Sequence, residues 1–250
     1  MTMSISLNSH ILDSNILIST ERKINNKIDM KTTTICIIIL LLFTNCSEAQ
    51  KPDNTKPHYG DIKKTQEYID LDNEFIQDAI KQFGSRKGAA KQHVSFGWDY
   101  IRKGDFSTAM KRFNQAWLLD STLNDVNWGY GAVLGATNQY EKSIFYLKKY
   151  ADSNMENPRI LIDLSTAYLN YANSLREHGQ NESSDLNIRK GKSCLLKYIS
   201  FDDKFAFAYN QLAAAYYFEN KIDSAKYYGK IAERLDPKAL SPELKKIIMN

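Results

Sequence analysis

The sequence predicts an all-α fold in which antiparallel helix pairs stack in series as a solenoid. Three observations lead to this prediction. From Ala90 onward the chain resembles itself at a spacing of 34 residues. Apolar residues recur at intervals of three and four, which is the period of one helix face. Proline, which interrupts helices, occurs only five times in 250 residues.

The repeat divides residues 90–239 into four units without gaps: 90–123, 124–157, 158–205 and 206–239. The third unit fits only if 14 extra residues are allowed. Small residues recur at one position of each first helix and at one position of each second helix, where they allow two helices to approach closely. These residues are Gly97, Gly131, Ser165 and Ala213 in the first helices, and Ala109, Ser143, Gly191 and Ala225 in the second.

Each unit is expected to be a helical hairpin with an apolar stripe on both helices. The turns carry Gly104-Asp105, Asn138-Gln139 and Asn220-Lys221, in which glycine or asparagine tolerates a positive φ. One hairpin cannot bury its own stripes, so neighbouring hairpins must stack on each other.

The extra residues of the third unit predict a longer first helix and a protruding loop. The apolar stripe continues to Leu175, about two turns past its usual end. The polar stretch from His178 to Ser184 is expected to form the loop, and Asp185 is expected to cap the following helix.

A further helix is expected at each end of the repeat. Residues 65–89 form the N-terminal cap, with an amphipathic helix whose apolar side carries Tyr68, Leu71, Phe75, Ala79 and Phe83. Residues 240–250 form the C-terminal cap, which begins at Ser241-Pro242-Glu243 and seals the stack with Leu244, Ile247 and Ile248.

The N-terminal region predicts export. Ile35 to Phe43 is the one strongly apolar run, and as a helix it would rise only about 13 Å, against a hydrocarbon core of about 30 Å. A positive start at Met30-Lys31 and a polar end after Phe43 complete the pattern of a signal peptide over residues 30–45. Because such a signal begins close to the start of translation, residues 1–29 are interpreted as an upstream extension that is not translated.

The segment around Cys46 resembles the lipobox of bacterial lipoproteins, although Phe43 and Asn45 stand where leucine and a small residue are usual. The resemblance implies cleavage before Cys46, a lipid on its thiol, and anchoring in a membrane of a Gram-negative bacterium, the outer membrane being favoured. The alternative is cleavage after Ala49, which would release a soluble periplasmic or secreted protein. A core strand of a cytosolic protein is disfavoured. Residues 46–64 contain prolines and few apolar residues, which is typical of a flexible tether.

Two units carry a recognisable family pattern. Unit 90–123 has Gly97, Tyr100, Ala109, Phe113 and Ala116, and unit 206–239 matches apart from Gly229. These residues resemble the tetratricopeptide repeat, and the resemblance covers 150 of 250 residues. It implies a right-handed superhelix whose first helices line a concave groove that binds peptides or other proteins. An unrelated helical bundle is the alternative.

The resemblance also implies which side chains face the groove. They are Lys91, Val94, Trp98, Ile101 and Arg102; Asp125, Trp128 and Ala132; Arg159, Ile162, Thr166 and Asn170; and Asn210, Ala214, Tyr217 and Phe218. Whether Trp98 and Trp128 bind a partner or only pack between hairpins is left open. The set does not match the Lys/Asn/Arg arrangement that grips a C-terminal carboxylate in some family members.

No catalytic chemistry is indicated. The net charge of +4 argues against a nucleic-acid binder. His58, His93 and His178 are far apart in the sequence, and no metal or cofactor site is expected. Cys194 lies on an apolar stripe and is interpreted as a core residue. The sequence therefore predicts a non-enzymatic, exported, lipid-anchored protein that binds proteins or peptides as a scaffold or adaptor at the cell envelope. The alternative is a ligand- or glycan-binding lipoprotein of an envelope nutrient-uptake system.

Overall fold

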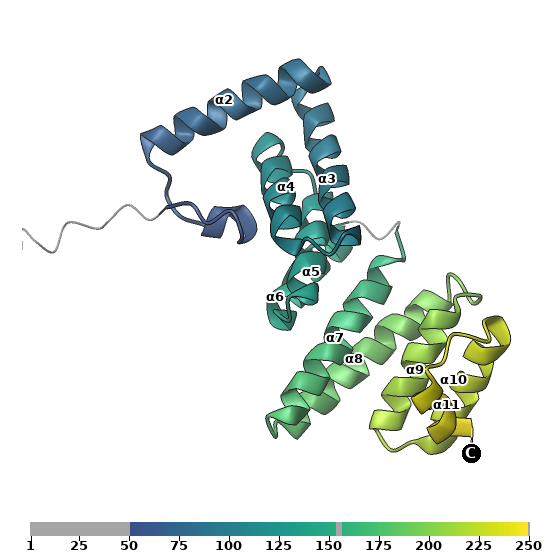
Figure 1. Ribbon diagram of the computed structural model, residues 1–250. Coiled ribbons are helices and arrows are strands. Elements are labelled where there is room, and N and C mark those ends of the chain that lie inside the picture. Colours follow the sequence, from purple (N-terminus) through teal and green to yellow (C-terminus); the bar gives the residue numbers. More distant parts are fainter. Residues whose placement is uncertain (1–50, 154–156, 250) are drawn as a thin grey trace, which may run out of the picture. The chain divides into compact units, whose positions relative to one another are not determined.

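The computed structural model describes residues 51–153 and 157–249, and this part of the chain is helical throughout, with no strand (Figure 1). The predicted all-α fold of stacked helix pairs is confirmed. A 3-10 turn, Pro57–Gly60, precedes ten α-helices. Their bounds are α2 Gln66–Phe83, α3 Arg86–Arg102, α4 Phe106–Leu119, α5 Asp125–Ala136, α6 Tyr140–Ser153, α7 Ile160–Glu177, α8 Asn181–Ile199, α9 Ala206–Phe218, α10 Ile222–Leu235 and α11 Pro242–Met249.

The pairs α3/α4, α5/α6, α7/α8 and α9/α10 are antiparallel hairpins that pack in chain order. Each second helix contacts the first helix of the next pair, and the first helices also contact one another in series, α3 with α5, α5 with α7, and α7 with α9. Comparable contacts do not join α4 with α6, α6 with α8, or α8 with α10 in the described part of the chain. The first helices therefore lie closer together and form one inner face.

The same turn closes all four hairpins. The second residue before each second helix has a left-handed backbone, with φ of 75° at Gly104, 62° at Asn138, 74° at Gly179 and 58° at Asn220. The next residue donates its backbone N–H to a carbonyl five positions back, at 3.0, 2.8, 2.9 and 2.9 Å respectively. This is the Schellman arrangement, which satisfies carbonyls at the end of the first helix.

A fully buried phenylalanine joins the first two units. The ring of Phe113 lies against Gly97 of its own unit and Gly129 of the next. A Cβ atom added at Gly97 would lie 2.5 Å from a ring carbon, and one added at Gly129 would lie 2.3 Å away. Only glycine fits at both positions, so these two residues let α3 and α5 approach the same ring.

The third unit differs from expectation. Its turn is as short as the others, and residues 181–184 are the first turn of α8, not part of a protruding loop. The small residue beside the turn is Ser184, whose Oγ donates to the Ala172 carbonyl at 2.8 Å, as Ser143 Oγ donates to Gly131 at 2.7 Å. The extra residues therefore lengthen both helices at the end away from the turn. Gly191 lies further along α8, beside Leu169.

Asp185 does not cap α8, because it lies within this helix and forms an ion pair with Arg176 of α7, at 2.8 Å.

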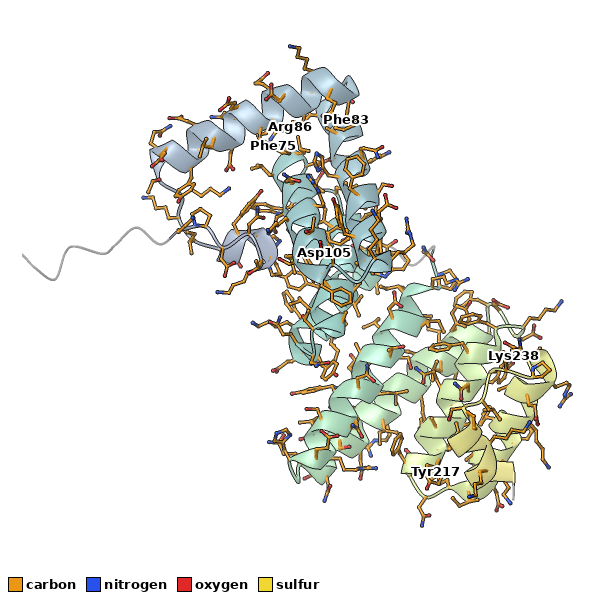
Figure 2. The ribbon with its side chains drawn as sticks, in the orientation of Figure 1. Phe75, Phe83, Arg86, Asp105, Tyr217 and Lys238 are labelled. Atoms are coloured by element: carbon orange, nitrogen blue, oxygen red, sulfur yellow. The ribbon has the colours of Figure 1, made fainter. Side chains whose placement is uncertain are left out.

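The terminal helices also differ in part from expectation. Residues 86–89 belong to α3, so the N-terminal cap is α2 alone, and Figure 1 shows it running across α3 and α4. Arg86, labelled in Figure 2, fixes the start of α3 by donating to the carbonyls of Leu119 and Leu118 at 2.7 and 3.1 Å. At the other end, Leu244 packs on the last core cluster, whereas the side chains of Ile247 and Ile248 lie outside those described.

The predicted tether is wrong for residues 51–64, which pack on the second helices. Asn114, fully buried on α4, donates to the carbonyls of Asn54 and Lys56 at 3.2 and 2.8 Å, and its own Oδ1 accepts from Tyr130 at 2.7 Å. The Tyr59 side chain is also buried, with Lys64 over its ring. Residues 46–50 lie outside the described residues.

Packing also stabilises an unusual backbone in this segment. His58, Tyr59, Gly60 and Asp61 all have positive φ, between 51° and 84°. Left-handed backbone costs roughly 1–2 kcal/mol per non-glycine residue, so neighbouring contacts must compensate. The His58 ring makes some of these contacts: its centroid lies 4.7 Å from that of Trp117 and 5.2 Å from that of Tyr130.

Substituting Gly129→Ala tests the packing around Phe113. Alanine favours a helix over glycine by about 1 kcal/mol, whereas overpacking a filled core costs about 1–3 kcal/mol. Because the added methyl would lie 2.3 Å from the ring, we expect the clash to outweigh the propensity and lower the unfolding free energy by about 1–2 kcal/mol, measured in urea. In a Phe113→Leu background the same substitution should cost less. Strictly additive effects would contradict the contact.

Candidate functional site: a groove along the first helices

The inner face carries two adjoining hollows. The first, of about 330 Å³, is lined by residues of α3, α5, α6 and α7. The second, of about 260 Å³, is lined by residues of α6, α7 and α9. Asn170 of α7 lines both hollows, so together they form one groove from Trp98 to Phe218. We call this the first-helix groove.

Small residues make the floor of the first hollow. Gly131, Ala132, Gly135 and Ala136 follow one another along α5, and Ala167 adjoins them from α7. Ser143 turns its hydroxyl inward to the Gly131 carbonyl and presents no free polar group there. Such a floor leaves room for the side chains of an extended peptide lying across it.

Two tryptophans stand at the boundary between core and groove. Trp98 packs edge-to-face on Phe113 and Trp128, with ring centroids 5.7 and 5.5 Å apart, and it also lines the first hollow. Trp128 does not line either hollow and packs against Tyr150, at 5.0 Å. Trp128 therefore packs only between hairpins, whereas Trp98 packs between hairpins and also lines the first hollow.

Asp163 is a groove residue that the sequence analysis missed. It lies within the apolar run of α7, lines the first hollow, and accepts a hydrogen bond from Trp128 Nε1 at 2.6 Å. Burial raises its pKa, although the Trp128 bond and the charge of Arg159 oppose the shift. A desolvated carboxylate at the groove can accept hydrogen bonds from an amide, a hydroxyl or a cation of a ligand.

The other expected groove residues fall into three sets. Ile101, Ala132, Thr166 and Asn170 line the first hollow, and Asn170, Ala214 and Phe218 line the second. Val94 and Ile162 are buried and belong to the core. The remainder line neither hollow: Lys91, Arg102 and Arg159 are exposed, and Asp125, Asn210 and Tyr217 are half-buried.

Interactions within the chain already engage two of the exposed cations. Arg102 forms an ion pair with Asp99, and the Arg159 guanidinium lies 4.9 Å from the centre of the Phe205 ring. The side-chain oxygen of Asn210, Oδ1, is buried and accepts no hydrogen bond in the described part of the chain.

Cys194 is the one cysteine among the residues that the structure describes. Burial raises the pKa of the Cys194 thiol to about 11, which keeps it protonated near neutral pH and unreactive. Within residues 51–153 and 157–249 no group of three histidine, cysteine or acidic side chains could hold a metal ion. No helix in the same ranges is long and apolar enough to span a membrane. Cys46 lies outside these ranges.

The chain was compared with known sequences and solved structures, and the similarity lies in the fold. No protein-family model matches the sequence, and no curated protein is similar to it. Among solved structures, a thermophilic TPR protein of Thermus thermophilus superposes with a TM-score of 0.52 at 14% identity, over 64% of this chain and 79% of that one. MamA from residue 41 onward, of Desulfovibrio magneticus RS-1, gives 0.49 at 16% identity, over 71% of this chain and 100% of that chain. PilF of Pseudomonas aeruginosa gives 0.47 at 17% identity, over 65% and 67%. The first of these shows that the described helices adopt a tetratricopeptide-like fold.

The substitution Asp163→Asn tests whether ionisation of the desolvated Asp163 carboxylate weakens the fold. The raised pKa means that the folded protein holds this proton to higher pH than the unfolded chain does, so ionisation weakens the fold. Stability due to Asp163 is therefore lost as pH rises from about 3.8 through the folded pKa. Asparagine keeps an acceptor for Trp128 and does not ionise, so the variant should equal or exceed the wild type in stability at pH 7.

Urea unfolding at about pH 3.5 and about pH 7, on either side of the ordinary carboxyl pKa, measures this difference, which should grow toward neutral pH. The exposed Asp152 of α6 supplies the control, because Asp152→Asn should show no such trend. A loss of stability in Asp163→Asn that is larger at neutral than at acidic pH would show that the ionised carboxylate stabilises the fold.

Proposed function

We propose that this protein is an exported, lipid-anchored adaptor of the cell envelope that binds an extended segment of another protein in the first-helix groove. The observation that carries the proposal is the run of two hollows along helices that come from different units of the stack. An elongated ligand contacts several units at once, whereas a small molecule would occupy one hollow. The role is non-enzymatic.

The groove offers apolar contacts at its ends and polar contacts between them. Trp98 lies at one end, and Phe218, which is 50% exposed, lies at the other. Asp163 and Asn170 lie between them. Aromatic side chains carry much of the energy of protein interfaces, and a few polar groups fix the register of the bound segment. This pattern suits a peptide with apolar side chains at both ends.

The glycan-binding alternative receives less support. It relied on aromatic platforms, but the Trp128 ring packs between Trp98 and Tyr150 and presents no face to either hollow. Sugar binding needs such an open face together with several hydrogen-bonding groups. The floor of the first hollow is instead made of glycine and alanine.

Anchoring at Cys46 would hold the protein close to the bilayer. Export and acylation are supported by the signal-like sequence alone, whereas packed structure is described from Lys51. Cys46 lies five positions before Lys51, and an extended chain spans at most about 3.5 Å per residue, so the reach is roughly 17 Å. The packed segment 51–64 thus leaves a short link in place of a long tether.

Site-specific photo-crosslinking in living cells tests the groove. A photoreactive phenylalanine analogue replaces Asn170, which lines both hollows, and in a control it replaces Ser193, which is exposed on α8 and lines none of the hollows described. We expect a discrete crosslinked protein from position 170 and none from position 193. Ala132→Trp in the position-170 strain should fill the floor and reduce the yield several-fold. Equal crosslinking from both positions would contradict binding in the groove.

Acyl labelling tests the anchor. Cells fed an alkyne-tagged fatty acid should yield a labelled protein whose mature chain begins at Cys46, and Cys46→Ala should abolish the label. Cys194→Ala is the matched control and should keep it. A mature chain that begins at Gln50 and carries no label would instead show simple secretion and would refute the lipid anchor, without bearing on the groove.

A further inference from the structure

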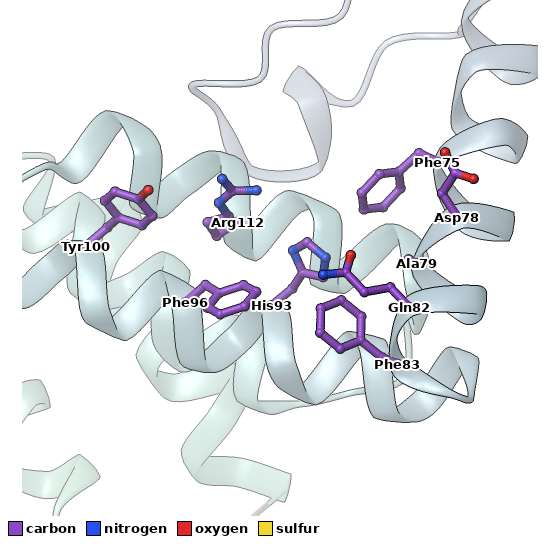
Figure 3. Close-up of a pocket in the computed structure, with 9 residues that line it drawn as sticks. All are labelled: Phe75, Asp78, Ala79, Gln82, Phe83, His93, Phe96, Tyr100 and Arg112. Atoms are coloured by element: carbon purple, nitrogen blue, oxygen red, sulfur yellow. The ribbon is translucent and has the colours of Figure 1, made fainter.

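A separate hollow lies at the N-terminal end of the stack. Its volume is about 410 Å³, within the usual range for small-ligand pockets. Helices α2, α3 and α4 line it, and it shares no residue with the first-helix groove (Figure 3). We call it the end hollow. Helix α2 packs on the stack through residues between Phe75 and Phe83, whereas Leu71, one turn earlier, is 53% exposed.

A buried histidine without a full set of partners lies in the end hollow. His93 is only 5% exposed, and its Nδ1 has no hydrogen-bond partner among the described residues. Three phenylalanines surround the ring edge-to-face, with centroids 5.4 Å away for Phe75, 6.0 Å for Phe83 and 5.6 Å for Phe96. A buried nitrogen without a hydrogen bond destabilises the fold, so its presence beside a hollow points to a ligand that donates to it.

The imidazole is neutral and its free nitrogen is an acceptor. Burial, followed by the charge of Arg112, lowers the pKa of His93 to about 4, and a hydrogen bond to the Gln115 side chain opposes the shift. Because Nδ1 has no hydrogen-bond partner among the described residues, we assign the ring proton to Nε2. The side-chain oxygen of Gln115 accepts a hydrogen bond from Arg112 Nη1 at 2.9 Å. Nδ1 therefore carries a lone pair that awaits a donor.

Arg112 supplies a positive charge without a counter-ion. Its half-buried guanidinium lies 5.8 Å from the centre of the Tyr100 ring, and no carboxylate of the described residues forms an ion pair with it. Figure 3 shows Asp78 on the other side of the imidazole from Arg112. The hollow thus has a cationic side and an acidic rim, and an anion entering it is directed to Arg112.

We propose that the end hollow binds an aromatic or large apolar carboxylate with an N–H group next to the acid. The ring or apolar chain lies among Phe75, Phe83 and Phe96, the carboxylate pairs with Arg112, and the N–H donates to His93 Nδ1. The C-terminal residue of a peptide has this chemistry, and so does a free N-acyl amino acid. The site is independent of the groove and needs no occupant there.

Calorimetric titration of the full-length protein in detergent tests the proposal with matched small molecules. N-acetyl-L-phenylalanine carries all three features, its primary amide lacks the charge, and 3-phenylpropionate lacks the N–H. We expect the acid to bind at a single site, at least tenfold more tightly than the amide and several-fold more tightly than 3-phenylpropionate. A peptide ending in phenylalanine, compared with the free N-acetyl acid, shows which source is preferred.

Two substitutions on α4 test whether Arg112 binds the carboxylate of the ligand. Arg112→Gln should remove the preference for acid over amide, while the neighbouring exposed Lys111→Gln should keep it. Nitrogen-15 chemical shifts of the imidazole add a readout that needs no variant, because a donated hydrogen bond moves the Nδ1 resonance of His93 upfield. Equal affinity for acid and amide in the wild type, no binding at millimolar acid, or an unchanged Nδ1 resonance at saturation would each overturn the proposal.

Discussion

The contact of the Phe113 ring with Gly97 and Gly129 is the constraint on which the inner face depends. A side chain at either glycine would push α3 or α5 away from the ring. Since α5 also contacts α7, a displaced α5 would alter the spacing of all the helices that line the first hollow. One further glycine of α5 serves both packing and groove shape: a Cβ added at Gly131 would lie 2.5 Å from the Leu147 side chain, and Gly131 also lines the first hollow.

The helix pairs and most of their turns could be predicted because the residues that determine them lie close together in the sequence of each repeat. A small residue beside the turn and a glycine or asparagine within it recur in every unit, and the backbone needs them there. The third unit shows where this reasoning fails. Ser165 and Gly191 matched the family pattern, yet the hydrogen-bonded pair beside the turn is Ala172 and Ser184, separated by 12 residues like Gly131 and Ser143. Spacing from the turn would have found the correct pair.

Long-range contacts explain what the sequence could not reveal. Residues 51–64 look like a linker by composition, but Asn114, some 60 residues away, satisfies their carbonyls, and a left-handed backbone brings His58 and Tyr59 onto the second helices. The groove set was predicted in part. Trp98, Ala132 and Asn170 lie at the hollows, whereas Val94 and Ile162 are core residues. Asp163 could not be found from the sequence, because its place at the groove depends on the hydrogen bond from Trp128, 35 residues away.

Two polar groups with desolvated side chains line the hollows. Asp163 is a carboxylate held at the groove by one indole N–H, and His93 is an imidazole with one bare nitrogen among phenylalanines. Each weakens the fold in isolation, and each adjoins a hollow of its own. Local conflicts of this kind concentrate where a protein binds something else. The two hollows share no lining residue, although α3 contributes residues to both.

Proton–proton nuclear Overhauser effects from the Phe113 ring test the stacking most directly, because they need no substitution. We expect strong cross-peaks from the ring to the α-protons of both Gly97 and Gly129, together with upfield ring-current shifts of those protons. Cross-peaks to Gly97 alone would mean that the second unit does not close on the first, and the groove described above would not exist.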